Sequence, residues 1–164
     1  MKKLCCLLLC LGCLLGMLAC GPVLEESEKN YAFLHGETKL EIDGEAAGVL
    51  SALGDWVDYT ESTSCMFTGL DKVYTYSSFE IQTYPMNGKD YIFMINLLDD
   101  TVKTEEGIRI GSSKEAVLSA YGEADTQSDT KLTYTGKGMY LEFLFRGTDD
   151  TVTDIRYCKQ VKQS

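Results

Sequence analysis

The sequence has almost none of the side chains that the common hydrolases use. Its only histidine is His35, and this residue lies beside a glycine in a polar segment, where we expect it to be solvated. Serine and cysteine nucleophiles normally need a histidine base and a third group that orients it. The sequence therefore predicts a protein that is not an enzyme and has no catalytic residues.

Paired carboxylates are the one remaining source of acid–base chemistry. Two such pairs occur, Asp99-Asp100 and Asp149-Asp150, and both fall in predicted hairpin turns, where aspartate is favoured for backbone reasons. Acid-rich turns could also collect calcium, but the sequence has no Asp-x-Asp-x-Asp-Gly loop. We expect solvated turns with no metal and no cofactor, and keep a divalent-metal or small-ligand module as the alternative function.

Positive charge is also scarce. Lysine and arginine number 15 against 25 acidic residues, which gives a formal net charge of −10, and no basic patch stands out. Such a surface repels phosphate backbones. Nucleic acid is therefore excluded as a partner.

The only long apolar run is at the N-terminus. Lys2 and Lys3 are followed by an apolar stretch from Leu4 to Leu18, which is shorter than the roughly 20 residues of a membrane-spanning helix. A short basic region before such a stretch is typical of a secretory signal. Five of the seven cysteines lie here, which argues against a metal site or a disulfide framework: Cys5, Cys6, Cys10, Cys13 and Cys20.

The end of this run resembles a lipobox, the cleavage site of bacterial lipoproteins. Leu18 and Ala19 precede Cys20, and Gly21 follows it; Met17 stands where leucine is more usual. Cys13 is a competing site with a shorter apolar region, and an ordinary signal peptide that leaves Cys20 free is the other alternative. The resemblance implies a signal peptide over residues 1–19, acylation (palmitate included) of Cys20, and an extracytoplasmic protein anchored to membrane lipid.

The segment after Cys20 is polar and begins with Gly-Pro. It has little apolar surface with which to fold alone. We therefore expect residues 20–37 to form a lipidated N-terminus and flexible tether. Tyr31, Phe33 and Leu34 interrupt its polar pattern, which makes its last part able to dock on the domain. The rest, residues 38–164, has the length of a single globular domain.

An internal repeat organises this domain. Residues 49–54 read Val-Leu-Ser-Ala-Leu-Gly, and residues 117–122 read Val-Leu-Ser-Ala-Tyr-Gly. In both copies the apolar residues share one face of a short helix that ends at glycine. Asp43 is the expected cap of the first helix, and Ser112 with Glu115 has the spacing of a capping box in the second. The two repeats are predicted over residues 38–103 and 104–158.

Each helix is followed by alternating stretches that predict strands. Asn87-Gly88 predicts a hairpin turn in the first copy. The predicted fold class is α+β, with tandem α-β-β-β repeats forming one antiparallel sheet that carries both helices on one face. A short strand is expected at residues 38–42, before the first helix. The others are expected at residues 72–76, 79–84 and 91–98 in the first copy and at residues 131–135, 139–146 and 151–157 in the second.

Two resemblances follow from these patterns. Ile108 to Glu123 is similar to the opening of the helix-plus-meander repeats of the β-lactamase-inhibitor-protein-like superfamily, which includes outer-membrane assembly lipoproteins and inhibitors. The stretch from Ser64-Cys65-Met66-Phe67 to Thr83-Tyr84-Pro85 resembles an uncharacterised family of lipoproteins from Gram-positive anaerobes, and that likeness extends from about Leu40 to Tyr157. It implies a fold and a location, with no activity to carry over.

A sheet with helices on one face leaves its other face free. Tyrosine is enriched at protein interfaces, and this face is predicted to bind another envelope protein through Tyr74, Tyr76, Glu80, Gln82 and Tyr84. The alternative is that these rings only cover the solvent side of the sheet.

Two cysteines remain after Cys20, and two alternatives stand for them. Cys65 and Cys158 either form a disulfide, as pairs of thiols outside the cytoplasm often do, or are two separately buried small apolar residues. Trp56, just after the first helix, is expected to fill the gap between helix and sheet.

Overall fold

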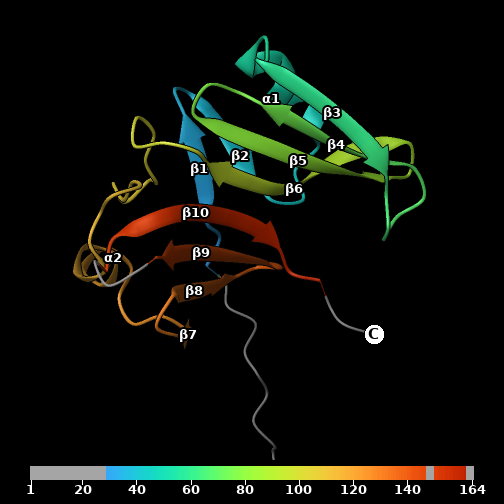
Figure 1. The fold of residues 1–164 in the computed structure, drawn as a ribbon. Coiled ribbons are helices and arrows are strands. Elements are labelled where there is room, and N and C mark those ends of the chain that lie inside the picture. The colour runs from blue at the N-terminus through green and yellow to red at the C-terminus, as the bar shows by residue number, and fades with distance from the viewer. Residues whose placement is uncertain (1–28, 147–149, 162–164) are drawn as a thin grey trace, which may run out of the picture.

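Strands make up most of the computed structural model, which describes residues 29–146 and 150–161 (Figure 1). The first four strands and the first helix are β1 (Ala32–His35), β2 (Thr38–Glu41), α1 (Ala46–Leu53), β3 (Asp58–Thr63) and β4 (Leu70–Thr75). The next elements are β5 (Phe79–Met86), β6 (Lys89–Leu97), α2 (Lys114–Tyr121) and β7 (Thr126–Gln127). The chain ends with β8 (Lys131–Gly136), β9 (Met139–Phe145) and β10 (Val152–Lys159).

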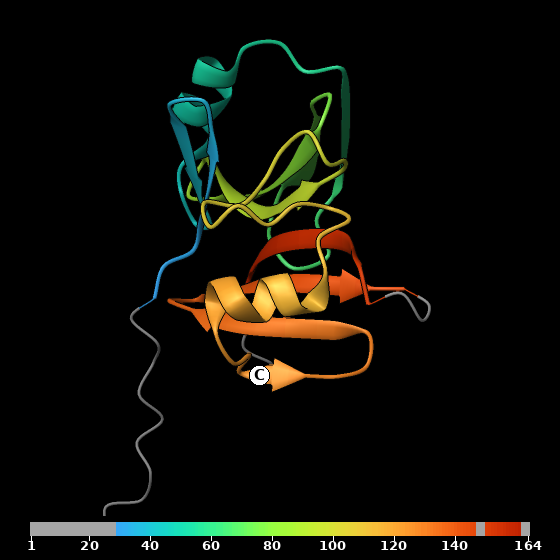
Figure 2. The ribbon, with the colours of Figure 1, turned by 90° about the vertical axis from the view of Figure 1, so that its left-hand side faces the viewer.

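Eight of these strands form one antiparallel sheet in the order β3-β4-β5-β6-β10-β9-β8-β7. Strands β3 to β6 are one meander and strands β7 to β10 are another. The two meanders join where β6 pairs with β10, with Ile95 opposite Tyr157. Figure 2 shows the meanders as the upper and lower parts of the molecule.

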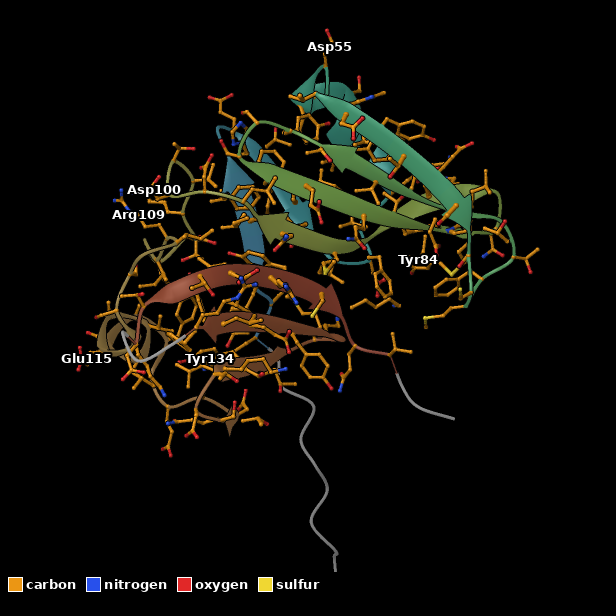
Figure 3. The ribbon with its side chains drawn as sticks, viewed as in Figure 1. Asp55, Tyr84, Asp100, Arg109, Glu115 and Tyr134 are labelled. Atoms are coloured by element: carbon orange, nitrogen blue, oxygen red, sulfur yellow. The ribbon has the colours of Figure 1, made fainter. Side chains whose placement is uncertain are left out.

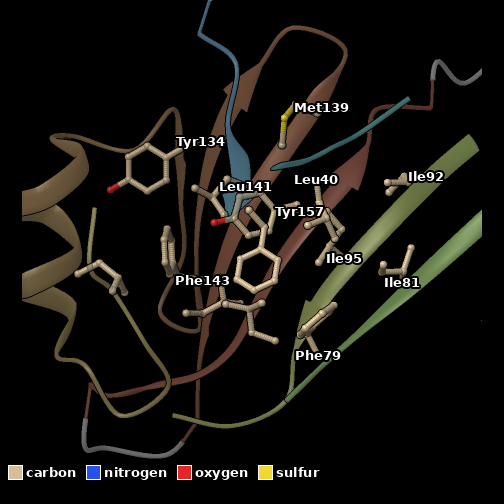
Figure 4. Close-up of a cluster of buried hydrophobic side chains, with 14 of the residues drawn as sticks. Leu40, Phe79, Ile81, Ile92, Ile95, Tyr134, Met139, Leu141, Phe143 and Tyr157 are labelled. Carbon is tan, nitrogen blue, oxygen red and sulfur yellow. The ribbon is translucent and has the colours of Figure 1, made fainter. Parts of the chain in front are cut away.

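A row of large side chains crosses one face of the sheet from β4 to β8. The register places Tyr74 beside Ile81, Ile81 beside Ile95, and Tyr157 beside Leu141, which is followed by Tyr134. All of these side chains are buried in one core cluster (Figure 4). Because side chains alternate between the two faces of a strand, this row fixes which face of each strand is the core face.

The hairpin of β1 and β2 covers the middle of this row. The Phe33 ring is fully buried and lies 5.1 Å from the Phe79 ring and 6.3 Å from the Tyr157 ring, measured between centroids. It therefore contacts both meanders. Before β1, the backbone oxygen of Lys29 accepts a hydrogen bond from Lys137 N at 2.8 Å.

These contacts correct the predicted tether over residues 20–37. From Lys29 onward this segment belongs to the folded domain, because β1 supplies a core residue. The remaining part of the predicted tether, together with the predicted signal peptide and Cys20, lies outside the described residues.

Both helices are short and end as the sequence predicted, with Gly54 and Gly122 at their C-termini. Their N-termini differ from the prediction. In α2 the cap is Ser113, whose Oγ accepts a hydrogen bond from Ala116 N at 3.2 Å, and in α1 the residue at the cap position is Glu45, with no side-chain cap. Asp43 lies in the preceding turn at φ 65°. No helix in the described part of the chain is long and apolar enough to cross a membrane.

The predicted fold class is wrong. The molecule is mostly β, its eight-stranded sheet is accompanied by a separate two-stranded sheet, and each helix is followed by four strands, where α-β-β-β units were expected. The helices do not form a common layer on one face: the β1–β2 hairpin lies between them (Figures 1 and 2). The missing strands are β1, β3 and β7. Every residue of β3 and β7 is exposed, so neither has the apolar alternation that reveals a half-buried strand.

Candidate functional site

Strand β3 is one of the two edge strands of the sheet. This strand pairs only with β4, and all six of its residues are exposed. Ser64 N donates to Gly69 O at 3.0 Å, directly after β3. Because hydrogen-bonded pairs alternate in an antiparallel ladder, the backbone groups of Tyr59, Glu61 and Thr63 point away from β4. They form a free sheet edge.

Large apolar side chains lie exposed at the start of this edge. Trp56 is 44% exposed, Val57 75% and Tyr59 38%. The Trp56 and Tyr59 rings pack on the buried Tyr74, at centroid distances of 5.0 Å and 5.1 Å. Trp56 therefore does not fill the gap between helix and sheet, as the sequence suggested. Trp56 and Tyr59 both pack on the Tyr74 ring, and this contact holds the two exposed rings in place.

An open depression lies beside these rings. Its volume is about 360 Å³, and its lining includes Leu50 and Ser51 of α1 together with Asp55, Trp56 and Tyr74. Asp55 projects at this end of the molecule, beside α1 and the start of β3 (Figure 3). The start of β3 and the residues just before it thus combine an open strand edge, two aromatic rings and a depression. We call this region, residues 55–63, the β3 edge surface.

The charge of the β3 edge surface is negative. Asp55, Asp58 and Glu61 are exposed, and the Tyr59 hydroxyl donates a hydrogen bond of 2.6 Å to Glu61 Oε2. That hydrogen bond, with a smaller contribution from burial, raises the pKa of Tyr59 to about 12. Tyr59 is therefore neutral at physiological pH, and the surface keeps three carboxylates.

The residues predicted to form a binding face are divided by the structure. Tyr74, Tyr76 and Tyr84 are 7%, 7% and 3% exposed, so these rings belong to the interior. Glu80 and Gln82 alternate with the core residue Ile81 and lie on the opposite face, half-buried, with Gln82 Nε2 donating to Glu80 Oε1 at 3.2 Å. The five side chains do not form one surface.

The sequence correctly placed Tyr74 and Tyr76 on one face by alternation but assigned that face to solvent. Tyr84 alternates with Ile81 and is buried on the other side, against the Phe67 ring. Its hydroxyl donates to Asp43 Oδ1 at 2.8 Å, so the polar tip is satisfied while the ring is covered. No sequence pattern pointed to β3. The adjacent Trp56 was the one signal that could have done so.

The two cysteines are both free thiols. Cys65 is exposed in the loop between β3 and β4, whereas Cys158 is half-buried on β10, with its Sγ 3.7 Å from Tyr140 O. Burial, with a smaller effect of Glu142, raises the pKa of Cys158 to about 11. The structure therefore has two separate thiols, but only Cys158 is partly buried, and Cys65 is not the buried residue that the second alternative expected.

The remaining polar candidates have structural partners. His35 lies at the end of β1, 4.9 Å from the Phe79 ring. Asp99 Oδ1 accepts a hydrogen bond from Thr101 N at 2.9 Å, which is the turn role expected of it, whereas Asp149 lies outside the described residues. Across residues 29–146 and 150–161 there is no group of three or more His, Cys, Asp or Glu side chains placed to hold a metal ion.

Comparison with known proteins gives a fold relationship. No protein-family model and no curated protein matches the chain. Among solved structures, the chain is similar to an extracellular protein containing an SCP domain from Bacillus anthracis str. Ames, with a TM-score of 0.55 and 10% sequence identity. The match covers 72% of this chain and 44% of that chain, so it spans less than half of the other protein. At this identity the likeness shows the fold alone.

Proposed function

We propose that this chain is a lipid-anchored, extracytoplasmic binding module that captures an extended segment of another envelope protein along β3. One observation carries the proposal: β3 is a fully exposed edge strand flanked by exposed aromatic and apolar side chains. Natural proteins usually protect such edges, because an unpaired strand is a template for pairing with another chain. An edge left open beside Trp56 and Tyr59 suits β-strand addition.

Charge defines the kind of segment that fits. The three carboxylates of the β3 edge surface, on a chain of net charge −10, favour an extended segment with basic side chains and oppose a second copy of this chain. Main-chain hydrogen bonds to Tyr59, Glu61 and Thr63 would supply affinity. Trp56 and the hollow beside it would select an apolar side chain.

The anchor is part of the same proposal. The lipobox-like Leu18-Ala19-Cys20 supports cleavage before Cys20 and acylation there. The protein from Bacillus anthracis with the similar fold is extracellular, which is consistent with an extracytoplasmic position. The chain between Cys20 and Lys29, where the folded domain begins, would space the domain from the bilayer. The resemblance to lipoproteins of Gram-positive anaerobes supports the same location.

We propose no catalytic role. Among the described residues, the exposed His35 lies beside the Phe33 and Phe79 rings, and no serine or cysteine is in contact with it. A small-ligand module is the second candidate, favoured by a cavity beneath the loop between β3 and β4.

Photocrosslinking in the intact envelope tests the proposal. With p-benzoylphenylalanine in place of Tyr59, we expect a specific crosslinked envelope protein. Thr63→Pro removes an N–H that points away from β4, which a sheet edge tolerates, and should reduce the crosslink at least tenfold.

Gln127→Pro is the matched control at the other sheet edge. Ser128 N donates to Lys131 O at 2.8 Å, so the Gln127 N–H also points away from its neighbouring strand. Gln127→Pro should leave the crosslink unchanged. Equal crosslinking in all three proteins, or none in the parent, would refute strand addition at β3.

A further inference from the structure

A second site lies on the face of the sheet opposite to the core. The loop of residues 64–69, between β3 and β4, folds back over β4 and β5 and encloses a cavity of about 130 Å³. The loop is held by its own hydrogen bonds: Ser64 Oγ accepts from Phe67 N at 3.0 Å, and Ser64 N donates to Gly69 O at 3.0 Å. The Phe67 ring packs 4.4 Å from the Tyr84 ring.

Gly69 allows the loop to close this tightly. It has a φ of 135°, and a Cβ at this position would approach Pro85 Cγ to 2.9 Å. Any other residue would therefore clash with β5 as well as adopt a backbone conformation that side chains disfavour. The geometry of the loop, and with it the cavity, depends on this glycine.

One carboxylate oxygen in the cavity lining has no hydrogen-bond partner. Asp71 Oδ1 is buried, and no hydrogen-bond partner reaches it in the part of the chain that the structure describes. The register pairs Lys72 with Thr83, so Asp71 alternates to the other face of β4, the face that also carries Val73 and lies under the loop. Leaving a buried charged atom unpaired is unfavourable. This oxygen is thus available to a bound molecule.

The lysine and the glutamine in the cavity lining are already paired. Lys72 Nζ is 2.7 Å from Asp90 Oδ2, with which it forms a half-buried ion pair, and the Gln82 amide donates to Glu80. The Asp71 carboxylate therefore remains as the charge that no cation balances. A carboxylate oxygen accepts hydrogen bonds and donates none, so its partner must be a donor, and a cation fits best.

The remaining walls are apolar. Val73, Phe93, Phe67 and Met66 line the cavity together with Cys65. An engineered protein cavity of about 150 Å³ accepts benzene, so the volume here suits a body of that size. The Tyr84 label in Figure 3 marks this end of the sheet, away from the Asp55 end of the β3 edge surface.

We infer that this cavity binds a small primary amine, with its ammonium group on Asp71 and a compact apolar body between Val73, Phe93 and Phe67. Ammonium provides three donors, so one of them can satisfy the buried Asp71 oxygen. The site is separate from the β3 edge surface, and neither proposal depends on the other.

Benzylamine is a suitable probe for the full chain in detergent micelles, with methionine methyl groups labelled by carbon-13. Met66 lines the cavity, and Met66→Leu identifies its NMR signal. We expect benzylamine to shift this signal saturably at millimolar or lower concentration, while signals of methionines remote from the cavity stay in place. Benzyl alcohol and toluene, which lack the charge, should bind at least tenfold more weakly.

Two substitutions complete the test. Asp71→Asn keeps the shape of the side chain and should weaken benzylamine binding at least tenfold while leaving toluene binding unchanged. Asp58→Asn removes an exposed carboxylate on the neighbouring strand and should change neither benzylamine binding nor toluene binding. Unaltered benzylamine binding in Asp71→Asn, equal affinities for benzylamine and toluene, or no shift of the Met66 signal with any probe would each overturn the inference.

Discussion

Buried tyrosine hydroxyls are the most informative single groups in the core. Tyr134 is 1% exposed, and its hydroxyl donates to Gly122 O at 2.9 Å, at the end of α2. Burial, followed by the charges near it, raises the pKa of Tyr134 to about 12. Burial is likewise the main cause that raises the pKa values of Tyr84, Tyr121 and Tyr157.

These shifts predict a loss of stability in alkali. A tyrosine ionises near pH 10 in the unfolded chain but holds its proton to about pH 12 at Tyr134 in the folded protein. The unfolded state therefore releases protons first, and the free energy of unfolding falls as the pH rises from about 10 to about 12. Urea unfolding at pH 8 and at pH 11 measures this decrease in the free energy of unfolding.

Tyr134→Phe is the matched variant, because it removes one titrating group and keeps the ring. It should reduce stability at pH 8 by about 1 kcal/mol through the lost hydrogen bond, and the further loss between pH 8 and pH 11 should be smaller than in the parent. An identical pH dependence in both proteins would contradict the assignment.

The two described thiols should differ sharply in reactivity. The thiolate is the reactive form, and Cys158 is half-buried with a pKa raised to about 11, whereas Cys65 is exposed. With iodoacetamide at pH 8 under native conditions, peptide mass spectrometry should show Cys65 labelled at least tenfold faster. Recovery of a peptide pair linked through Cys65 and Cys158 would contradict two free thiols.

Among the elements, the β1–β2 hairpin is the one whose importance is least apparent in the sequence. It follows a polar stretch, yet Phe33 lies over the junction of the two meanders, against Phe79 and Tyr157. Its neighbour Leu34 points outward and is 40% exposed. The hairpin thus closes the core that the two helices leave uncovered.

Phe33→Ala tests this role. Removal of a fully buried phenyl ring should lower the free energy of unfolding by about 3–5 kcal/mol, measured by urea denaturation. Leu34→Ala, the next position on the same strand, should cost less than about 1 kcal/mol. If residues 29–36 were a tether, the two changes would have equally small effects.

The difference between predictable and unpredictable elements has one physical cause, burial on one face. The seven predicted strands overlap β2, β4, β5, β6, β8, β9 and β10, and both repeat helices are present. The Asn87-Gly88 turn is also confirmed, with both residues at positive φ between paired Met86 and Lys89. These segments alternate because one side of each faces the core.

Edge strands lack this alternation of apolar and polar residues. The candidate site lies on such a strand and was missed for the same reason. β3 reads Asp-Tyr-Thr-Glu-Ser-Thr and buries nothing, so only its pairing with β4 defines it. Tyr74 and Tyr76 were grouped correctly by alternation, but a sequence does not state which face of a strand the rest of the chain covers. That choice depends on the hairpin and helices, which are distant in sequence.

At the scale of the whole molecule, the two meanders share one core. Ile95 of the first meander is opposite Tyr157 of the second, and the core cluster runs through both. Neither meander can lose its structure without exposing the apolar face of the other. The β3 edge surface lies at the outer edge of the first meander, as far along the strand order as possible from β7.

A shared core predicts a single unfolding transition. Fluorescence of Trp56, the only tryptophan, reports on the first meander, and far-ultraviolet circular dichroism reports on the whole sheet. Their urea midpoints should coincide. A fluorescence transition that clearly precedes the loss of the circular dichroism signal would show that the meanders unfold separately.

Hydrogen exchange of the chain bound to its crosslinked envelope partner tests the central claim most directly. Strand addition at β3 should slow exchange at the amides of Tyr59, Glu61 and Thr63, whose N–H groups point away from β4, by at least tenfold. The amides of Thr60 and Ser62, already bonded to β4, should change less. Protection confined to other elements, with those three amides exchanging as in the free chain, would show that the partner does not pair with β3.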